Sequence, residues 1–177
     1  MEWIVPKKER RPEPPFGYVV SFVAFHERGF GVPAGAFIRG TLERVKLELQ
    51  HLTPNGVQHI AVFEALCEGY LFCEAHADLF AHLFSFSLQR DPTGHPAAIG
   101  CAALKAKSDR GDLYLAGSLA SSNKGWHSGW LYLRNDAARP LPRYTGRTFD
   151  SAHQEWKWGL RRPTATNLGP PWRPWRR

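Results

Sequence analysis

The sequence predicts an α+β fold, with helices grouped in the N-terminal half and a small antiparallel sheet in the C-terminal half. Apolar residues recur at three- and four-residue steps through residues 37–71, which is typical of amphipathic helices. After residue 94 the apolar segments become short runs separated by polar turns, which is typical of strands. The 177 residues, 43% of them hydrophobic, are enough for one domain with a core, so a wholly disordered chain is excluded.

The first elements follow a leader that is rich in charge and proline. Residues 1–16 are predicted to be this flexible leader. The run 18–25 is apolar, β-branched and aromatic, and its length favours a buried strand. An amphipathic helix is expected over 33–49, because Pro33 suits a first helical turn and apolar residues follow at helical spacing.

The strongest helix signal begins at Thr53-Pro54, where Thr53 can cap the helix and Pro54 fits its first position. This helix is expected to run to Leu71 and to form the centre of the core. A shorter helix is predicted over 77–88, before the turn residues 91–94. The apolar stripe of the long helix consists of Val57, Ile60, Phe63, Leu66, Cys67, Tyr70 and Leu71.

The second half of the chain predicts strands. Residues 97–104 and 112–116 are apolar runs separated by a polar stretch, so they are expected to pair antiparallel. Residues 130–133 are apolar at every position, which indicates a strand that is central in the sheet or lies between two layers. The domain is expected to span 17–159, with Trp156 and Trp158 in its last packed segment, before a disordered basic tail, 160–177, rich in proline and tryptophan.

The net charge of +7 is concentrated in the tail. Residues 153–177 hold six basic groups against Glu155, whereas the chain before them is nearly neutral. Arginines interleaved with tryptophans can pair with phosphates and stack on bases, and the alternative is a disordered tail without a role. The candidate nucleic-acid residues are Arg161, Arg162, Trp172, Arg173, Trp175, Arg176 and Arg177.

A second candidate is a recognition loop formed by Asn123, Lys124, Trp126 and His127, which combines amide, ammonium and aromatic groups. Such groups are common in loops that bind RNA or peptides. The alternative, which we favour, is that Trp126 and Trp130 pack into the core, because tryptophan is highly buried on average.

Catalytic and metal signals are weak. His26-Glu27 lies beside two glycines without a partner nucleophile, so we interpret it as a charged corner, and we expect it not to share a pocket with Asp150 and His153. His51, His59, Glu64 and Glu68 lack the spacing of a metal site. We therefore expect no enzymatic activity, no cofactor, no metal and no small-molecule substrate.

The cysteines and the hydropathy pattern bear on location. Cys67, Cys73 and Cys101 are odd in number and lack metal-binding spacing, which favours free thiols in an intracellular, reducing compartment. No run of about 18 apolar residues is present, so no membrane contact is expected.

Three segments, in this order, carry a family resemblance. They are Phe25-His26-Glu27-Arg28-Gly29-Phe30-Gly31-Val32-Pro33, the segment from His51-Leu52-Thr53-Pro54-Asn55-Gly56 to Glu68, and Ser122-Asn123-Lys124-Gly125-Trp126-His127 with Trp130–Asn135. Over residues 17–159 the chain resembles the plant gypsy-type transposon (transposase) domain. Where relatives tend to have glycine and an aliphatic residue, this chain has Phe72-Cys73, which argues against a tight turn there.

The resemblance implies a non-catalytic domain of a plant long-terminal-repeat retrotransposon-derived protein. Its implied role is a structural or protein-interaction module, Gag-like in location, with protein partners or self-association. The alternative is a module for single-stranded nucleic acid that uses the tail and the Lys124/Trp126 loop. An exposed apolar patch would favour protein assembly, whereas a continuous basic face from Lys124 to the tail would favour nucleic acid.

Overall fold

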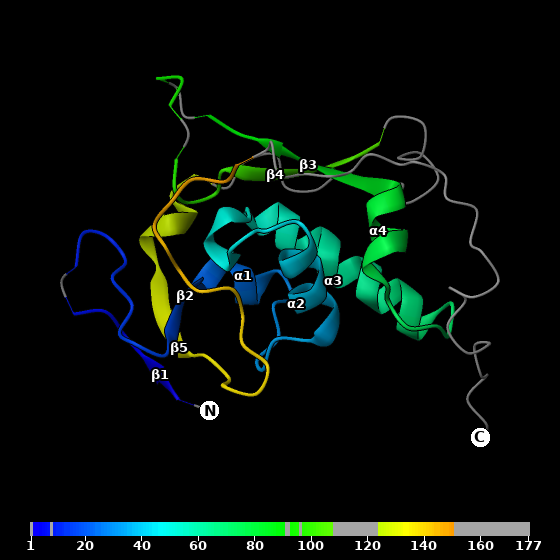
Figure 1. The fold of residues 1–177 in the computed structure, drawn as a ribbon, viewed down its shortest axis with the longest axis horizontal. Helices are drawn as coiled ribbons and strands as arrows, with labels where there is room; N and C mark the ends of the chain where they lie inside the picture. Colours follow the sequence, from blue (N-terminus) through cyan, green and yellow to red (C-terminus); the bar gives the residue numbers. More distant parts are fainter. Residues whose placement is uncertain (1, 8, 91–92, 96, 108–123, 151–177) are drawn as a thin grey trace.

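The computed structural model describes residues 2–7, 9–90, 93–95, 97–107 and 124–150, and it confirms the α+β class (Figure 1). Helices pack beside two small antiparallel sheets. In chain order the elements are β1 (Trp3–Ile4), β2 (Tyr18–Phe22), α1 (Val23–Glu27), α2 (Ala36–Arg44), the 3-10 helix η1 (Leu49–His51), α3 (Pro54–Gly69), α4 (Ala77–Leu83), β3 (Phe84–Leu88), β4 (Ala102–Ala106), the 3-10 helix η3 (Trp126–Ser128) and β5 (Trp130–Arg134).

One sheet joins the two halves of the described chain. Its strand order is β1-β5-β2, so β5 is central, as the apolar run 130–133 predicted. β2 pairs with β5 along its whole length, from Tyr18 opposite Arg134 to Phe22 opposite Trp130. β1, which lies in the predicted leader, pairs with the other edge of β5. The sheet therefore draws strands from the N-terminal half too, including Trp3–Ile4 of the predicted leader.

The strand predicted over 18–25 is too long. It ends at Phe22, and Val23–Glu27 form the short helix α1. In an extended strand Phe22 and Phe25 would point to opposite faces, whereas one helical turn brings both to the same side. Both are fully buried, and their ring centroids lie 5.2 Å apart.

The helix predicted over 33–49 is also shorter than expected, because α2 begins at Ala36 and ends at Arg44. Lys46 has a φ of 54°, in the left-handed region, and the amide of Leu47 donates to the carbonyl oxygen of Leu42 at 2.9 Å. This bond pattern closes a helix end without the usual glycine. Val45 and Leu49 are still buried, but outside the helix.

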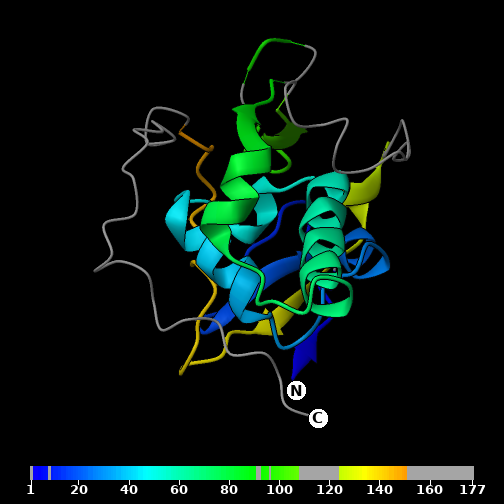
Figure 2. The same cartoon turned by 90° about the vertical axis from the view of Figure 1, so that its right-hand side faces the viewer.

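α3 is the centre of the core, as predicted. The Thr53 hydroxyl accepts a hydrogen bond from the amide of Gly56 at 3.1 Å, and Pro54 occupies the first turn. In Figure 1, α2 and α3 lie between the three-stranded sheet and α4, and Figure 2 shows the helices from the side of α4. Leu66 is half-buried, and the predicted stripe is wrong at its end, where Tyr70 and Leu71 are exposed. The buried residues of the stripe are Val57, Ile60, Phe63 and Cys67.

The helix predicted over 77–88 divides into α4 and the strand β3. β3 pairs antiparallel with β4, from Phe84 opposite Ala106 to Leu88 opposite Ala102. Phe84 and Phe86 are buried and alternate with serines, which is the period of a strand. β4 also begins later than the strand predicted over 97–104. The predicted strand 112–116, the segment with Trp156 and Trp158, and the tail lie outside the described residues.

None of the helices in the described part of the chain has the length and apolar character needed to span a bilayer.

Candidate functional site

A run of exposed apolar residues follows α3. Tyr70, Leu71 and Phe72 are 78%, 57% and 76% exposed, and we call residues 70–72 the aromatic turn. Leu79 on α4 is also exposed. The last buried residue of α3 is Cys67, so the chain leaves the core before this turn. In Figure 1 the end of α3 lies on the side of the molecule away from the three-stranded sheet.

The backbone of the aromatic turn is strained at Phe72. Its φ is 52°, in the left-handed region that costs a non-glycine residue about 1–2 kcal/mol. The turn is closed by two backbone hydrogen bonds of 3.0 Å, from the Leu71 amide to Leu66 and from the Cys73 amide to Cys67. The expectation that Phe72-Cys73 argues against a tight turn is therefore wrong. A glycine at this position would adopt the same turn without the strain.

Several carboxylates lie close to the aromatic turn in the sequence. Glu68, Glu74 and Asp78 are exposed, and Asp78 forms an ion pair with Arg44. Glu64 is half-buried on α3, and its burial, together with the charge of Glu68, raises the pKa of its carboxyl group. This surface is therefore apolar and acidic, which disfavours contact with phosphates.

Exposed arginines occupy a different part of the described chain. Arg139, Arg143 and Arg147 follow β5 and are exposed, and no ion pair among the described residues involves them. The Asn135 side chain fixes the start of this segment through two hydrogen bonds to Leu141. It accepts one from the Leu141 amide at 2.8 Å and donates one to the Leu141 carbonyl oxygen at 3.0 Å. The near-zero net charge of the chain before residue 153 conceals this grouping in the sequence.

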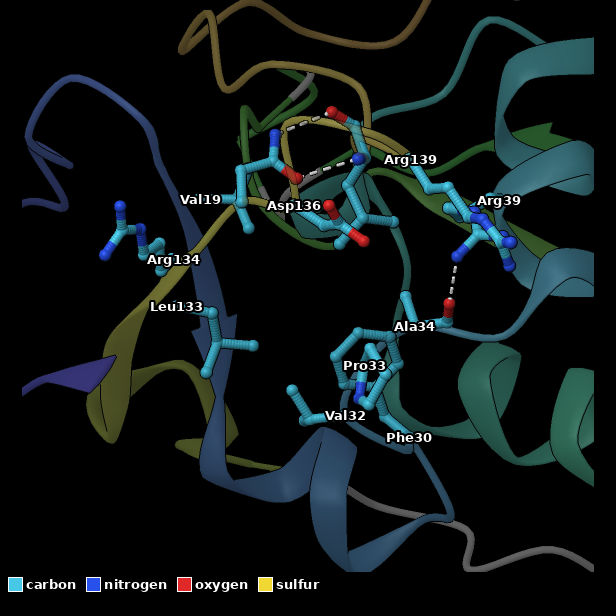
Figure 3. A pocket seen from close by; sticks show the side chains of 12 residues that line it. Val19, Phe30, Val32, Pro33, Ala34, Arg39, Leu133, Arg134, Asp136 and Arg139 are labelled. Carbon is cyan, nitrogen blue, oxygen red and sulfur yellow. Dashed lines mark hydrogen bonds between the residues drawn. The ribbon is translucent and has the colours of Figure 1, made fainter. Parts of the chain in front are cut away.

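A small cavity lies between β2, β5 and residues 30–39 (Figure 3). Its volume is about 30 Å³, which fits about one water molecule. Val19, Phe30 and Leu133 are among the apolar side chains that line it, and the Arg39 guanidinium is held by the carbonyl oxygen of Ala34. This cavity cannot enclose a small-molecule substrate.

A larger cavity of about 540 Å³ lies between residues 12–18 and 135–144. Prolines and the two tyrosines Tyr18 and Tyr144 contribute much of its lining. The Asn135 side chain, which also lines this cavity, is hydrogen-bonded to the backbone of Leu141. Its titratable side chains are Glu13, Arg143 and the two tyrosines.

His26 forms a structural link. Its Nδ1 lies 3.2 Å from the carbonyl oxygen of Phe30, and its Nε2 lies 3.0 Å from the hydroxyl of Ser21. A carbonyl can only accept, so Nδ1 carries the proton and Nε2 accepts from Ser21. Ser21 is fully buried, which prevents it from reaching a substrate. Glu27 and Asp150 are exposed, and His153 lies outside the described residues.

His51 closes the turn before α3 and anchors a distant segment. Its Nδ1 accepts from the amide of Glu48 at 3.0 Å, so its Nε2 donates to the carbonyl oxygen of Arg147 at 2.9 Å. The Glu48 carboxylate accepts from the amide and the hydroxyl of Thr145, at 2.7 and 2.5 Å. The side chains of Glu48 and His51 thus hold residues 145–147 to the helical layer.

No group of three or more His, Cys, Asp or Glu side chains that could bind a metal occurs among the described residues.

Acid is expected to destabilise the fold through its histidines. Burial lowers the pKa of His26, His51 and His59 below the ordinary value of 6.5. Below pH 6.5 these histidines therefore bind more protons in the unfolded chain than in the folded chain. Their contribution to stability is complete above pH 6.5, and it is lost as the pH falls through the folded pKa values. Glu64, whose pKa is raised, opposes this trend because its folded form takes up a proton more readily.

Urea unfolding between pH 7.5 and 5.5 measures this loss. The variant His59→Gln should have a shallower dependence, since His59 lies against Phe84 and its Nδ1 has no hydrogen-bond partner in the described part of the chain. His127→Gln, at an exposed histidine, is the control and should retain the wild-type slope. A stability that stays constant or rises toward pH 5.5 would contradict the prediction.

The predicted recognition loop is described from Lys124 onward, and Asn123 lies outside the described residues. Lys124 and His127 are exposed. The ring of Trp126 packs on Phe22 and Phe25, with centroid distances of 4.8 and 5.3 Å. The indole ring also lies directly against Gly100, where a Cβ atom would come within 2.7 Å of the ring. Trp126 thus packs on the core, while Lys124 and His127 remain open to solvent.

The candidate nucleic-acid tail stays a prediction from the sequence. Arg161, Arg162, Trp172, Arg173, Trp175, Arg176 and Arg177 all lie outside the described residues. The basic face that would join this tail to Lys124 therefore remains a prediction.

Comparison with known proteins gives one relationship. Residues 19–88 match the family model described as "Putative gypsy type transposon". No curated protein and no solved structure matches the chain. The matched region runs from β2 to β3 and includes α3 and the aromatic turn. Over residues 19–88, which are less than half of its length, the chain is therefore similar to gypsy-type transposon domains.

Proposed function

We propose that this chain is a non-catalytic, Gag-like structural module that binds a second copy of itself. The aromatic turn of one copy would contact Arg139, Arg143 and Arg147 of the next. The observation that carries this proposal is the combination of exposure and strain at Phe72, whose side chain is 76% exposed on a backbone with a φ of 52°.

Both features of Phe72 are unfavourable in a single copy. An exposed phenylalanine leaves apolar surface in water, and its left-handed backbone adds strain. A glycine would remove both costs without changing the turn. Backbone strain at an exposed side chain is typical of functional positions, where a contact made outside the monomer offsets the cost. Tyr70 and Leu71 extend this surface into a continuous apolar run.

The charges around the turn favour an arginine-bearing partner. Glu68 and Glu74 flank the aromatic side chains, so a guanidinium could bond a carboxylate while stacking on Tyr70 or Phe72. Three exposed arginines of this kind lie within Arg139–Arg147. They follow β5 in the sequence, whereas the aromatic turn follows α3. One molecule therefore offers both complementary surfaces.

Because the two surfaces differ, the contact would be head-to-tail. Such a contact uses one surface from each copy and leaves the other free, so it produces rings or filaments instead of closed dimers. This geometry suits a structural module. Its charged component makes the association weaker at high salt.

The variant Phe72→Gly should separate association from stability. We expect it to abolish or strongly weaken self-association, which sedimentation velocity measures across concentration at low salt. The free energy of unfolding should stay unchanged or rise by up to about 1 kcal/mol, because relief of strain exceeds the added chain entropy. Urea unfolding of the same variant measures this second quantity.

Charge reversal tests the partner surface. The double variants Arg139→Glu/Arg143→Glu and Glu68→Arg/Glu74→Arg should each fail to associate alone, and an equimolar mixture should associate again. Val23→Ala, at an exposed apolar position of α1, and Lys105→Glu, on β4, are matched controls that should associate like the wild type. A wild-type chain that stays monomeric at low salt, or association that survives Phe72→Gly, would contradict the proposal.

A further inference from the structure

Two cysteines enclose the aromatic turn. Cys67 is the last buried residue of α3, with no exposed surface, and Cys73 follows Phe72 and is exposed. The amide of Cys73 donates a hydrogen bond to the carbonyl oxygen of Cys67, with an N–O distance of 3.0 Å. The left-handed backbone of Phe72 turns the chain back so that this bond can form. The two residues are therefore neighbours in space although six positions apart.

This arrangement suits a covalent link. The backbone hydrogen bond places Cys73 next to Cys67 in space, and a disulfide requires two cysteines that are such close neighbours. The two thiols also interact directly, since a hydrogen bond from one to the other contributes to the electrostatics of Cys67. Cys101 lies elsewhere in the fold, where its sulfur accepts a hydrogen bond from the amide of Phe149 at 3.3 Å.

We propose that Cys67 and Cys73 form a reversible disulfide across the aromatic turn, made by exchange with a low-molecular-weight disulfide such as oxidised glutathione. Exposure makes Cys73 the first residue to react. Its thiolate attacks one sulfur of glutathione disulfide, the S–S bond breaks, and the leaving glutathione thiolate takes up a proton. Cys73 is then joined to one glutathione.

The second step closes the turn. Cys67 loses its proton and attacks the sulfur of Cys73, which expels the second glutathione as a thiolate that is protonated in turn. The two cysteines are oxidised and one glutathione disulfide is reduced to two thiols. Burial, and then the neighbouring Cys73, raise the pKa of Cys67 to about 11. Deprotonation of Cys67 therefore limits the second step near neutral pH, and the rate of this step should rise about tenfold per pH unit between pH 7 and 9.

The consequence concerns the interaction surface. A disulfide from Cys67 to Cys73 would hold Tyr70, Leu71 and Phe72 in a closed loop and prevent the turn from opening. Closing a short loop also restricts the unfolded chain, so the midpoint of thermal unfolding should rise by about 5 °C. Self-association, if it uses this turn, would then respond to the redox state.

Peptide mass spectrometry of the full chain tests the link without reference to any partner. The native protein is incubated with excess oxidised glutathione, alkylated and digested with trypsin. Both cysteines fall in one tryptic peptide, residues 47–90, and Cys101 falls in another. The expected product is peptide 47–90 that has lost two hydrogen atoms and resists alkylation. Reduction with dithiothreitol should restore two alkylated cysteines, while the peptide with Cys101 carries no glutathione.

Three variants complete the test. Cys67→Ala should accumulate glutathione on Cys73, Cys73→Ser should remain unmodified, and Cys101→Ser should behave like the wild type. A wild-type chain that stops at the glutathione adduct on Cys73, or that shows no modification, would overturn the proposal. Those results would leave self-association of the reduced chain untouched, so the two proposals fail separately.

Discussion

Replacing Phe63 by alanine is expected to cost about 3–5 kcal/mol of unfolding free energy, because it removes a fully buried ring from the centre of α3. Phe63 is 1% exposed. Its ring stacks on Phe37 at a centroid distance of 5.2 Å and meets the edge of Phe80 at 5.1 Å. The cavity would therefore open where α2, α3 and α4 meet. Urea unfolding of the wild type and the variant at pH 7.5 measures the difference.

Leu71→Ala is the matched control for this prediction. Leu71 is 57% exposed just beyond the end of α3, so its truncation should change stability by less than about 1 kcal/mol. Equal losses from the two variants would show that α3 does not carry the core. A loss below 1 kcal/mol from Phe63→Ala would have the same meaning.

The elements with local signals were predictable from the sequence. Thr53 and Pro54 mark the start of α3, and the apolar run of β5 indicates its central place in the sheet. β3 was also readable, because Phe84 and Phe86 alternate with serines, but the two phenylalanines also continue the apolar spacing of α4. The end of α2 had no such signal, since Lys46 adopts a left-handed conformation that usually marks a glycine.

The pairing of strands that are distant in the chain cannot be predicted from a local sequence pattern. β2 and β5 are more than a hundred residues apart in the chain, and neither segment alone specifies the other as its partner. The aromatic turn has the same difficulty, because Tyr70 and Leu71 continue the helical spacing of buried residues and so suggested burial. Tyr70 and Leu71 are exposed because α3 ends before them, at Gly69. Net charge likewise concealed the separation of acidic and basic surfaces.

The tail supplies the second large prediction, which concerns nucleic acid. A chain that ends at Trp158 loses five arginines and falls from a net charge of +7 to +2. The full chain is expected to bind single-stranded RNA or DNA weakly, with an affinity that decreases as salt increases. The truncated chain should bind almost none, because the described surface around α3 and α4 is acidic.

The salt dependence of the affinity shows whether nucleic-acid binding rests on charge or on specific contacts. Each phosphate contact to a single strand contributes about 0.7 to the slope of log affinity against log salt, so five arginines account for at most about 3.5. Stacking by Trp172 and Trp175 would add about 1–3 kcal/mol per base. Fluorescence titrations of both chains, at four salt concentrations, measure the slope. Equal affinity with and without the tail would move the binding site into the folded domain, where Lys124 and His127 are the exposed groups of the predicted recognition loop.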